Sequence, residues 1–388
     1  MPRLPLASVI ALVAAGLAGC GGGPASPTIH GRTLTIYSSL PLEGVSAPAA
    51  RAVAAGESFA LSEAGARTAH RRVRLVRLDS TRPGERIWDP ALVSENAKRA
   101  ANDPSSVAYL GDLDYGASAV SVPITNEKEI LQVSPGDGLA SLTTIPPGRP
   151  QAGPARYYPT DERSFVRLGT SDLRLADVLL ARAREAGVRR LAIVFDGHIY
   201  GRELAAELVA RARKDGPHPV AADELHGDPA GMPGLVKDLT ADHPDAIVYA
   251  GVAGPLTSPL FAALASGLPQ VPVFASSGVL KRRPPLTAAP LRVEAVATVP
   301  PAGRLPRSSR RLLRRIAGHA GLASVGAEAL NGYESVRLVL SAVDRAGPSR
   351  RSILRSAMNH RRTPLVQTNR FYLYRLDGGR FRFDRELR

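Results

Sequence analysis

The sequence LAIVFDGHIYGR at residues 191–202 is the clearest sign of the architecture of this chain. Residues 191–195 are apolar throughout, which predicts a buried strand, and Asp196 and Gly197 end that strand in a turn. The residues that follow, 202–214, predict a helix. A strand that leads directly into a helix is the repeating unit of a parallel sheet covered by helices.

The same unit recurs on both sides of this stretch. Further strands are expected at 34–37, 73–78, 107–111, 130–133, 246–249 and 271–274. Further helices are expected at 49–64, 116–127 and 256–265. Two more helices are expected to begin after the capping residues Asp89 and Ser171. The Pro/Gly-rich stretch 145–159 separates two such series. We therefore predict an α/β protein with two doubly wound parallel-sheet lobes, whose ligand site lies at the carboxyl ends of the strands.

The composition excludes several classes of protein. A chain of 388 residues with 44% hydrophobic residues is neither disordered nor a miniprotein, and it is long enough for two domains. Its only cysteine, Cys20, excludes an internal disulfide and a cysteine-based zinc site. The net charge of +15 comes without a basic motif interleaved with aromatic residues, so nucleic-acid binding is not expected. No metal and no cofactor is expected either.

The N-terminus predicts export and a membrane anchor. A short basic start is followed by the apolar run 4–17, which is too short to span a bilayer and fits a signal peptide. Leu17-Ala18-Gly19-Cys20 resembles the bacterial lipoprotein cleavage box, which implies removal of residues 1–19 and lipidation of Cys20. A plain secretory signal with a chance cysteine is the alternative. Residues 20–33 are then the lipidated cysteine and a flexible tether, at the extracytoplasmic face of the cell membrane.

Several loops resemble those of one family. The motifs are Leu110-Gly111, Leu131-Gln132-Val133-Ser134-Pro135-Gly136, the Phe195–Arg202 segment with its Tyr-Gly pair, Gly267-Leu268 and Gly332-Tyr333-Glu334-Ser335. In this order they resemble the branched-chain amino-acid (Leu/Ile/Val) binding proteins of ABC transporters, in lipoprotein form. The resemblance implies the type I periplasmic-binding fold, in which two lobes joined by three crossovers close on a ligand like a hinge.

The resemblance also implies domain boundaries. Lobe one would comprise residues 34–165 plus 300–362, and lobe two residues 166–299 plus 363–388. The crossovers would lie near Arg163, Val299 and Leu365.

In amino-acid-binding members of this family, hydroxyls and backbone N–H groups at helix starts in lobe one hold the ligand carboxylate. The matching positions here are Tyr115, Gly116, Ala117, Ser118, Gly136, Asp137 and Gly138, with Tyr200 in lobe two. Glu43, in the loop after the first strand, is a further candidate. Asp112 and Asp114 either cap the helix near 116 or touch the ligand.

Three positions depart from the family. Ala49 replaces an aromatic residue, Val252 a tyrosine, and Ser277 the carboxylate that receives the ligand ammonium. Because a buried ammonium needs an ionised partner, either Asp137 supplies that charge or the ligand has no amine. We expect a ligand other than a simple aliphatic α-amino acid, such as an amide, a urea-like compound, or a polar molecule with hydroxyl and cationic groups.

The sequence thus predicts a lipid-anchored substrate-binding protein that captures a small polar solute and delivers it to an ABC permease. The alternative is a sensor or regulatory lipoprotein of the same fold. No catalytic motif is present, and a serine hydrolase using Ser118 or Ser277 would need a histidine that the sequence does not place. The basic amphipathic segment 307–316 predicts a solvated helix face, or else a contact with anionic lipid or the permease.

Overall fold

The computed structural model describes residues 29, 31–85, 87–146, 149–281, 290–347, 349–360 and 370–387. The predicted signal peptide, Cys20 and the third predicted crossover at Leu365 lie outside these residues. None of the helices in the described ranges is both long enough and apolar enough to cross a bilayer.

The first lobe is built on a six-stranded sheet with the strand order β2-β3-β1-β4-β5-β6. Its neighbouring strands are parallel except for the short pair β2–β3. The strands are β1 (Thr33–Leu40), β2 (Arg67–Thr68), β3 (Arg71–Asp79), β4 (Ser106–Leu110), β5 (Leu131–Ser134) and β6 (Phe165–Arg167). The helices are α1 (Ala47–Glu63), α2 (Pro90–Asn102), α3 (Ser118–Glu127), α8 (Arg307–His319), α9 (Ala329–Ala346) and α10 (Arg350–Asn359).

The second lobe is built on a seven-stranded sheet with the order β13-β12-β11-β10-β9-β7-β8. It is parallel up to β11, and β12 and β13 add an antiparallel hairpin at one edge. The strands are β7 (Arg190–Asp196), β8 (His218–Leu225), β9 (Ala246–Ala250), β10 (Val273–Ser276), β11 (Val293–Ala297), β12 (Phe371–Asp377) and β13 (Arg380–Leu387). The helices are α4 (Asp172–Glu185), α5 (Ile199–Asp215), α6 (Met232–Ala241) and α7 (Thr257–Gly267).

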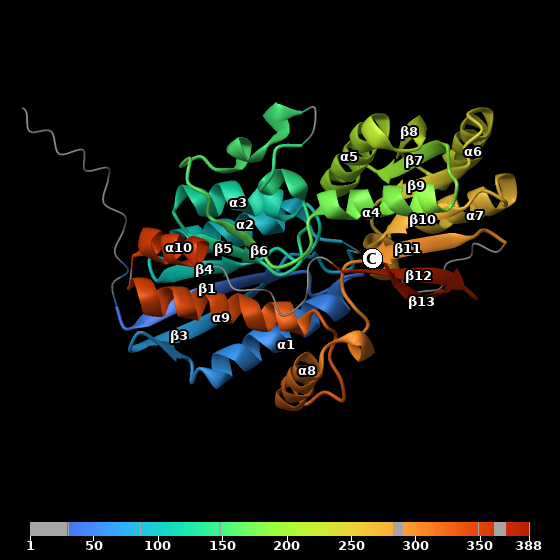
Figure 1. Ribbon diagram of the computed structural model, residues 1–388. Coiled ribbons are helices and arrows are strands. Elements are labelled where there is room, and N and C mark those ends of the chain that lie inside the picture. Colours follow the sequence, from blue (N-terminus) through green and yellow to red (C-terminus); the bar gives the residue numbers. More distant parts are fainter. Residues whose placement is uncertain are drawn as a thin grey trace, which may run out of the picture.

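The order of the elements shows that the chain passes between the two lobes three times. Figure 1 shows the passages after β6 and after β11. The chain leaves the first sheet after β6, which pairs with β5, so this passage lies beyond the predicted position at Arg163. It returns after β11 to form α8, α9 and α10, and then enters the second sheet again as β12. Two α/β lobes with mainly parallel sheets confirm the predicted fold class.

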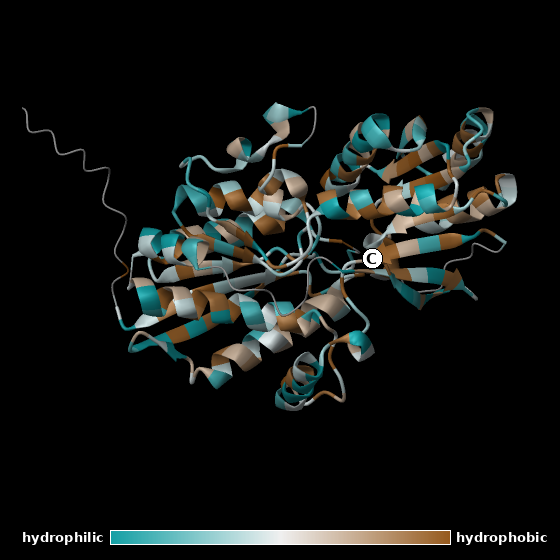
Figure 2. Ribbon diagram, in the orientation of Figure 1, coloured by the Kyte–Doolittle hydropathy of each residue, from teal (hydrophilic) through white to brown (hydrophobic). Residues whose placement is uncertain are grey.

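Hydrophobic strands form the centre of each lobe, while the exposed sides of the helices are hydrophilic (Figure 2). β4 and β9 are buried along their whole length, which agrees with their mainly apolar sequences. The Asp89 side chain caps α2 by accepting a hydrogen bond from the Leu92 amide at 2.9 Å, as predicted. Ser171 stands at the N-cap of α4, but its side chain makes no capping hydrogen bond.

A close approach of α1 and α9 fixes one wall of the site. A Cβ atom on Gly332 would lie 2.1 Å from the Val53 carbonyl oxygen, and one on Gly56 would lie 2.0 Å from the Ala329 oxygen. Only glycine allows the two helix backbones to pack this tightly. The first turn of α9 therefore packs against the middle of α1.

Candidate functional site

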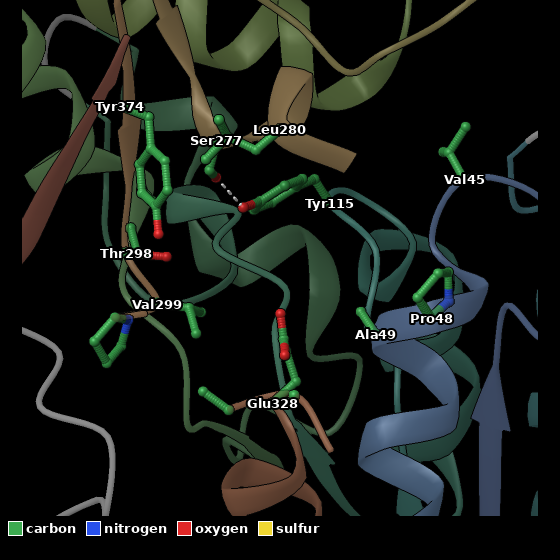
Figure 3. A pocket seen from close by; sticks show the side chains of 14 residues that line it. Val45, Pro48, Ala49, Tyr115, Ser277, Leu280, Thr298, Val299, Glu328 and Tyr374 are labelled. Carbon is green, nitrogen blue, oxygen red and sulfur yellow. Dashed lines mark hydrogen bonds between the residues drawn. The ribbon is translucent and has the colours of Figure 1, made fainter. Parts of the chain in front are cut away.

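A cavity of about 450 Å³ lies between the two lobes. Lobe one contributes the first turn of α1, the loop after β4 and the start of α9, and the other wall comes from the segments after β10 and β11 and from β12. The residues that line it are Val45, Pro48, Ala49, Tyr115, Ser277, Leu280, Ala297, Thr298, Val299, Pro300, Gly326, Ala327, Glu328 and Tyr374 (Figure 3). A cavity of this size suits a small molecule.

Tyr115 reaches across the cleft from lobe one to lobe two. Its hydroxyl and that of Ser277 form a hydrogen bond of 2.5 Å, drawn as a dashed line in Figure 3. Its ring stacks on that of Tyr200, with centroids 4.3 Å apart and planes at 20°. Tyr115 thereby separates the cavity from a smaller hollow, which is lined by Val45, Ser46, Ile87, Trp88, Asp114, Tyr115, His198, Tyr200, Val252 and Gly278.

Four of the predicted site residues thus meet at the cleft: Tyr115, Tyr200, Val252 and Ser277. Tyr200 is 1% exposed, and the neighbouring Tyr115 ring covers it. The Val252 amide is already engaged, because it donates to the Asp196 carboxylate at 2.7 Å. Their contact with a ligand stays a prediction.

Asp137 differs from what the sequence suggested. It is fully buried, and its carboxylate accepts hydrogen bonds from the amides of Gly116 at 3.0 Å, Ser118 at 2.8 Å and Leu139 at 3.0 Å. Burial raises the pKa of Asp137, and these three amides oppose that rise. The amides of Gly116 and Ser118, which we expected to hold a ligand carboxylate, are therefore occupied by a carboxylate of the chain itself. Asp137 lines neither the cavity nor the hollow, so it supplies no charge there.

The remaining small residues of these loops pack closely. A Cβ on Gly136 would lie 2.7 Å from Leu113, and one on Gly138 would lie 2.4 Å from the Asp172 carboxylate. Gly116 has a φ of 81°, and a Cβ there would lie 3.3 Å from the Tyr200 amide of lobe two. Ala117 and Ser118 are buried at the start of α3. Gly116 and Gly138 thus lie where lobe one approaches α5 and α4 of lobe two.

The sequence left two roles open for Asp112 and Asp114, a helix cap or a ligand contact. Neither side chain caps α3, and the two residues lie in different surroundings. Asp112 is buried beneath the loop, where it accepts from Ser121 Oγ at 2.6 Å and from the Tyr109 hydroxyl at 3.1 Å. Burial raises the pKa of Asp112 to about 7. Asp114 accepts from Ser46 Oγ at 2.5 Å and lines the smaller hollow.

Glu43 is exposed and lines neither space. Its carboxylate accepts a hydrogen bond from the Gly84 amide at 3.2 Å, which ties together the loops after β1 and β3. Its local role is to hold these loops.

Three further residues line the cavity and were not predicted from the sequence: Thr298 after β11, Glu328 before α9, and Tyr374 on β12. Glu328 immediately precedes α9, and the Gly-Tyr-Glu-Ser motif on that helix was the signal closest to it. Among the residues that the structure describes, no group of three or more His, Cys, Asp or Glu side chains is placed to hold a metal ion.

Comparison with known proteins places the chain in a family. The profile of the periplasmic binding protein family matches residues 33–373. A search of the curated proteins found no match.

Solved structures share the fold at low sequence identity. One is an ABC transporter substrate-binding protein from Desulfitobacterium hafniense in complex with Leu, at a TM-score of 0.68 and 17% identity, covering 91% of this chain and 100% of that one. Another is the leucine binding protein LivK from Thermotoga maritima, also at 0.68 and 17%, covering 91% and 98%. A third is a solute binding protein from R. palustris in complex with 4-hydroxybenzoate, at 0.69 and 14%, covering 92% and 96%. With the family profile spanning both lobes, the chain belongs to the periplasmic binding protein family and has its type I fold.

Proposed function

We propose that this chain is a lipid-anchored, extracytoplasmic substrate-binding protein that captures a small polar solute between its lobes and delivers it to an ABC permease. The solute class that the sequence indicates is amino-acid-like, amide or urea-like. The observation that carries the proposal is the cavity of about 450 Å³ whose walls come from both lobes. A solute there touches both lobes at once, so binding favours the closed arrangement.

The alternative is a sensor or regulatory lipoprotein of the same fold. Its lobes would close on the solute in the same way, but the closed form would bind a signalling partner instead of a permease. The exposed arginines of α8 (Arg307, Arg311, Arg314 and Arg315) offer a basic surface for a permease or anionic lipid in either case.

Catalysis has no support at the cleft. The Ser277 hydroxyl bonds to Tyr115, and the Ser118 hydroxyl accepts from the Asp112 amide at 3.1 Å. In the described ranges neither serine has a histidine partner of the kind that activates a nucleophile.

The function is tested by looking for the solute and for closure. Native mass spectrometry of protein purified without refolding should show one retained small molecule, which denaturation releases. After it is removed by unfolding and refolding, adding it back should reduce the radius of gyration in small-angle scattering, because the lobes close. A solute that binds, as measured independently, and leaves the radius unchanged would contradict capture between moving lobes.

The anchor is tested at Cys20. Cys20→Ser removes the thiol that lipidation requires, so the variant should appear in the soluble or unprocessed fraction and should no longer partition into detergent. The wild-type chain, expressed in the same cells, is the control and should fractionate with the membrane. If the variant remained with the membrane as the wild type does, the anchor would have to lie elsewhere.

A further inference from the structure

We infer that the cavity between the lobes selects a small organic cation, an ammonium or guanidinium compound that carries no carboxylate and is held by Glu328. This inference rests on the proposed function, since it names the class of solute that the same site takes. It differs from the solutes in the similar solved structures, because leucine and 4-hydroxybenzoate both carry a carboxylate.

A ligand carboxylate would find few free donors at the helix starts around the cleft. The amides at the start of α3 are held by the Asp137 carboxylate. In the first turn of α1, Pro48 has no N–H, and the Ala47 amide donates to the Gly44 oxygen. The first amides of α9, those of Ala329 and Leu330, donate to carbonyl oxygens of the preceding turn. A ligand carboxylate in the cavity would therefore lose hydrogen bonds to water without gaining hydrogen bonds from these backbone amides.

Glu328 gives the cavity a negative charge. It is half-buried, and its side chain does not cap α9. Within the described part of the chain its carboxylate has no hydrogen bond or ion pair. Figure 3 shows the side chain extending from the start of α9 into the cavity, toward Tyr115 and Thr298. Of the described residues that line the cavity, none is Lys, Arg or His. A carboxylate without a counter-ion in such a space attracts a cation.

Aromatic rings and hydroxyls complete the recognition. Tyr115 and Tyr374 present rings to the same cavity, and an organic cation binds favourably against such a ring. The pKa of Tyr374 is raised to about 12, mainly by burial and further by the charge of Glu328, so the phenol stays neutral and lies within the field of that carboxylate. The hydroxyls of Thr298 and Ser277 can orient a polar group.

The adjoining hollow shares Val45 and Tyr115 with the cavity, and Asp114 and His198 also line it. The volume of about 450 Å³ accommodates a small cation such as choline, putrescine or agmatine.

The experiment compares three sets of solutes by thermal shift on the purified protein. The cations are choline, putrescine, agmatine and ethanolamine, the carboxylates are leucine and benzoate, and the neutral compounds are urea and acetamide. At least one cation should raise Tm, and the carboxylates and neutral compounds should leave it unchanged. By titration calorimetry, Glu328→Gln should then weaken the binding of that cation by about tenfold or more, because a charge-assisted contact is lost.

Two variants serve as controls. Glu85→Gln removes the same charge from an exposed residue that lines neither space, so it should retain wild-type affinity. Glu328→Asp keeps the charge and should bind more tightly than Glu328→Gln. The Tm of each variant without solute shows that it is folded.

The outcomes separate the inference from the proposed function. If leucine, benzoate, urea or acetamide binds and no cation does, the inference is wrong and solute capture stands. Equal weakening by Glu328→Gln and Glu85→Gln, or no weakening by Glu328→Gln, would also overturn the role of Glu328. If no solute binds and native mass spectrometry finds none retained, the proposed function fails, and the inference fails with it.

Discussion

Asp137→Ala is expected to lower the free energy of unfolding by about 3–5 kcal/mol. The lost carboxylate is the acceptor for the amides of Gly116, Ser118 and Leu139, and all three residues are buried. Without it these N–H groups have no acceptor, and burial keeps water from replacing it. Urea denaturation followed by circular dichroism measures the change.

Asp137→Asn is the matched variant. Its side-chain oxygen can still accept hydrogen bonds from Gly116 and Leu139, which both donate to Oδ1 in the wild type, so it should lose less stability. Added formate should raise the Tm of Asp137→Ala and leave the wild type unchanged, since it can occupy the emptied carboxylate position. A fully stable Asp137→Ala protein would show that these amides do not depend on Asp137.

Several inner strands could be predicted because their sequences are mainly apolar runs. β4, β7 and β9 are examples, and each is followed by a loop and a helix, which the sequence also indicates. The edge strands were missed, and so were the inner strands β11 and β12 of the second sheet, the first of which has Glu294 in its buried run. β8 is only partly buried, and β13 alternates Arg with Phe before its polar end, so neither resembles the buried runs on which the prediction was based.

The sequence indicates several loops that meet at the cleft, but not which groups their side chains contact. Tyr115, Tyr200 and Val252 follow strands whose carboxyl ends face the cleft, so the topology brings them together. The hydrogen-bond donors to the Asp137 carboxylate are set by the path of its loop past the start of α3. No local sequence pattern predicts that path. Glu328 immediately precedes α9, in the part of the chain that has returned to lobe one, far in sequence from the strand-end loops.

Two buried carboxyls, Glu57 and Asp112, should make the protein less stable as the pH rises from about 4.5 to about 7. Burial raises the pKa of each to about 7, although Arg77 opposes the rise at Glu57 and Ser121 opposes it at Asp112. In the unfolded chain both lose their protons near pH 4. Between these values the folded protein holds more protons than the unfolded chain, so the free energy of unfolding falls with rising pH. Above about pH 7 both states are deprotonated, and this contribution levels off.

Glu57→Gln is expected to reduce the loss of stability between about pH 5 and about pH 8 by about 2 kcal/mol. This is less than the whole pKa shift at Glu57 represents, because the unfolded chain has already lost much of this proton at pH 5. Glutamine keeps an acceptor for Ser38 Oγ, which bonds to Glu57 at 2.8 Å, but does not titrate. Glu95→Gln makes the same change at an exposed residue of α2 and should leave the pH dependence unchanged. Urea denaturation of the three proteins at both pH values gives the comparison. If Glu57→Gln loses as much stability as the wild type, Glu57 is already ionised in the folded protein at the lower pH.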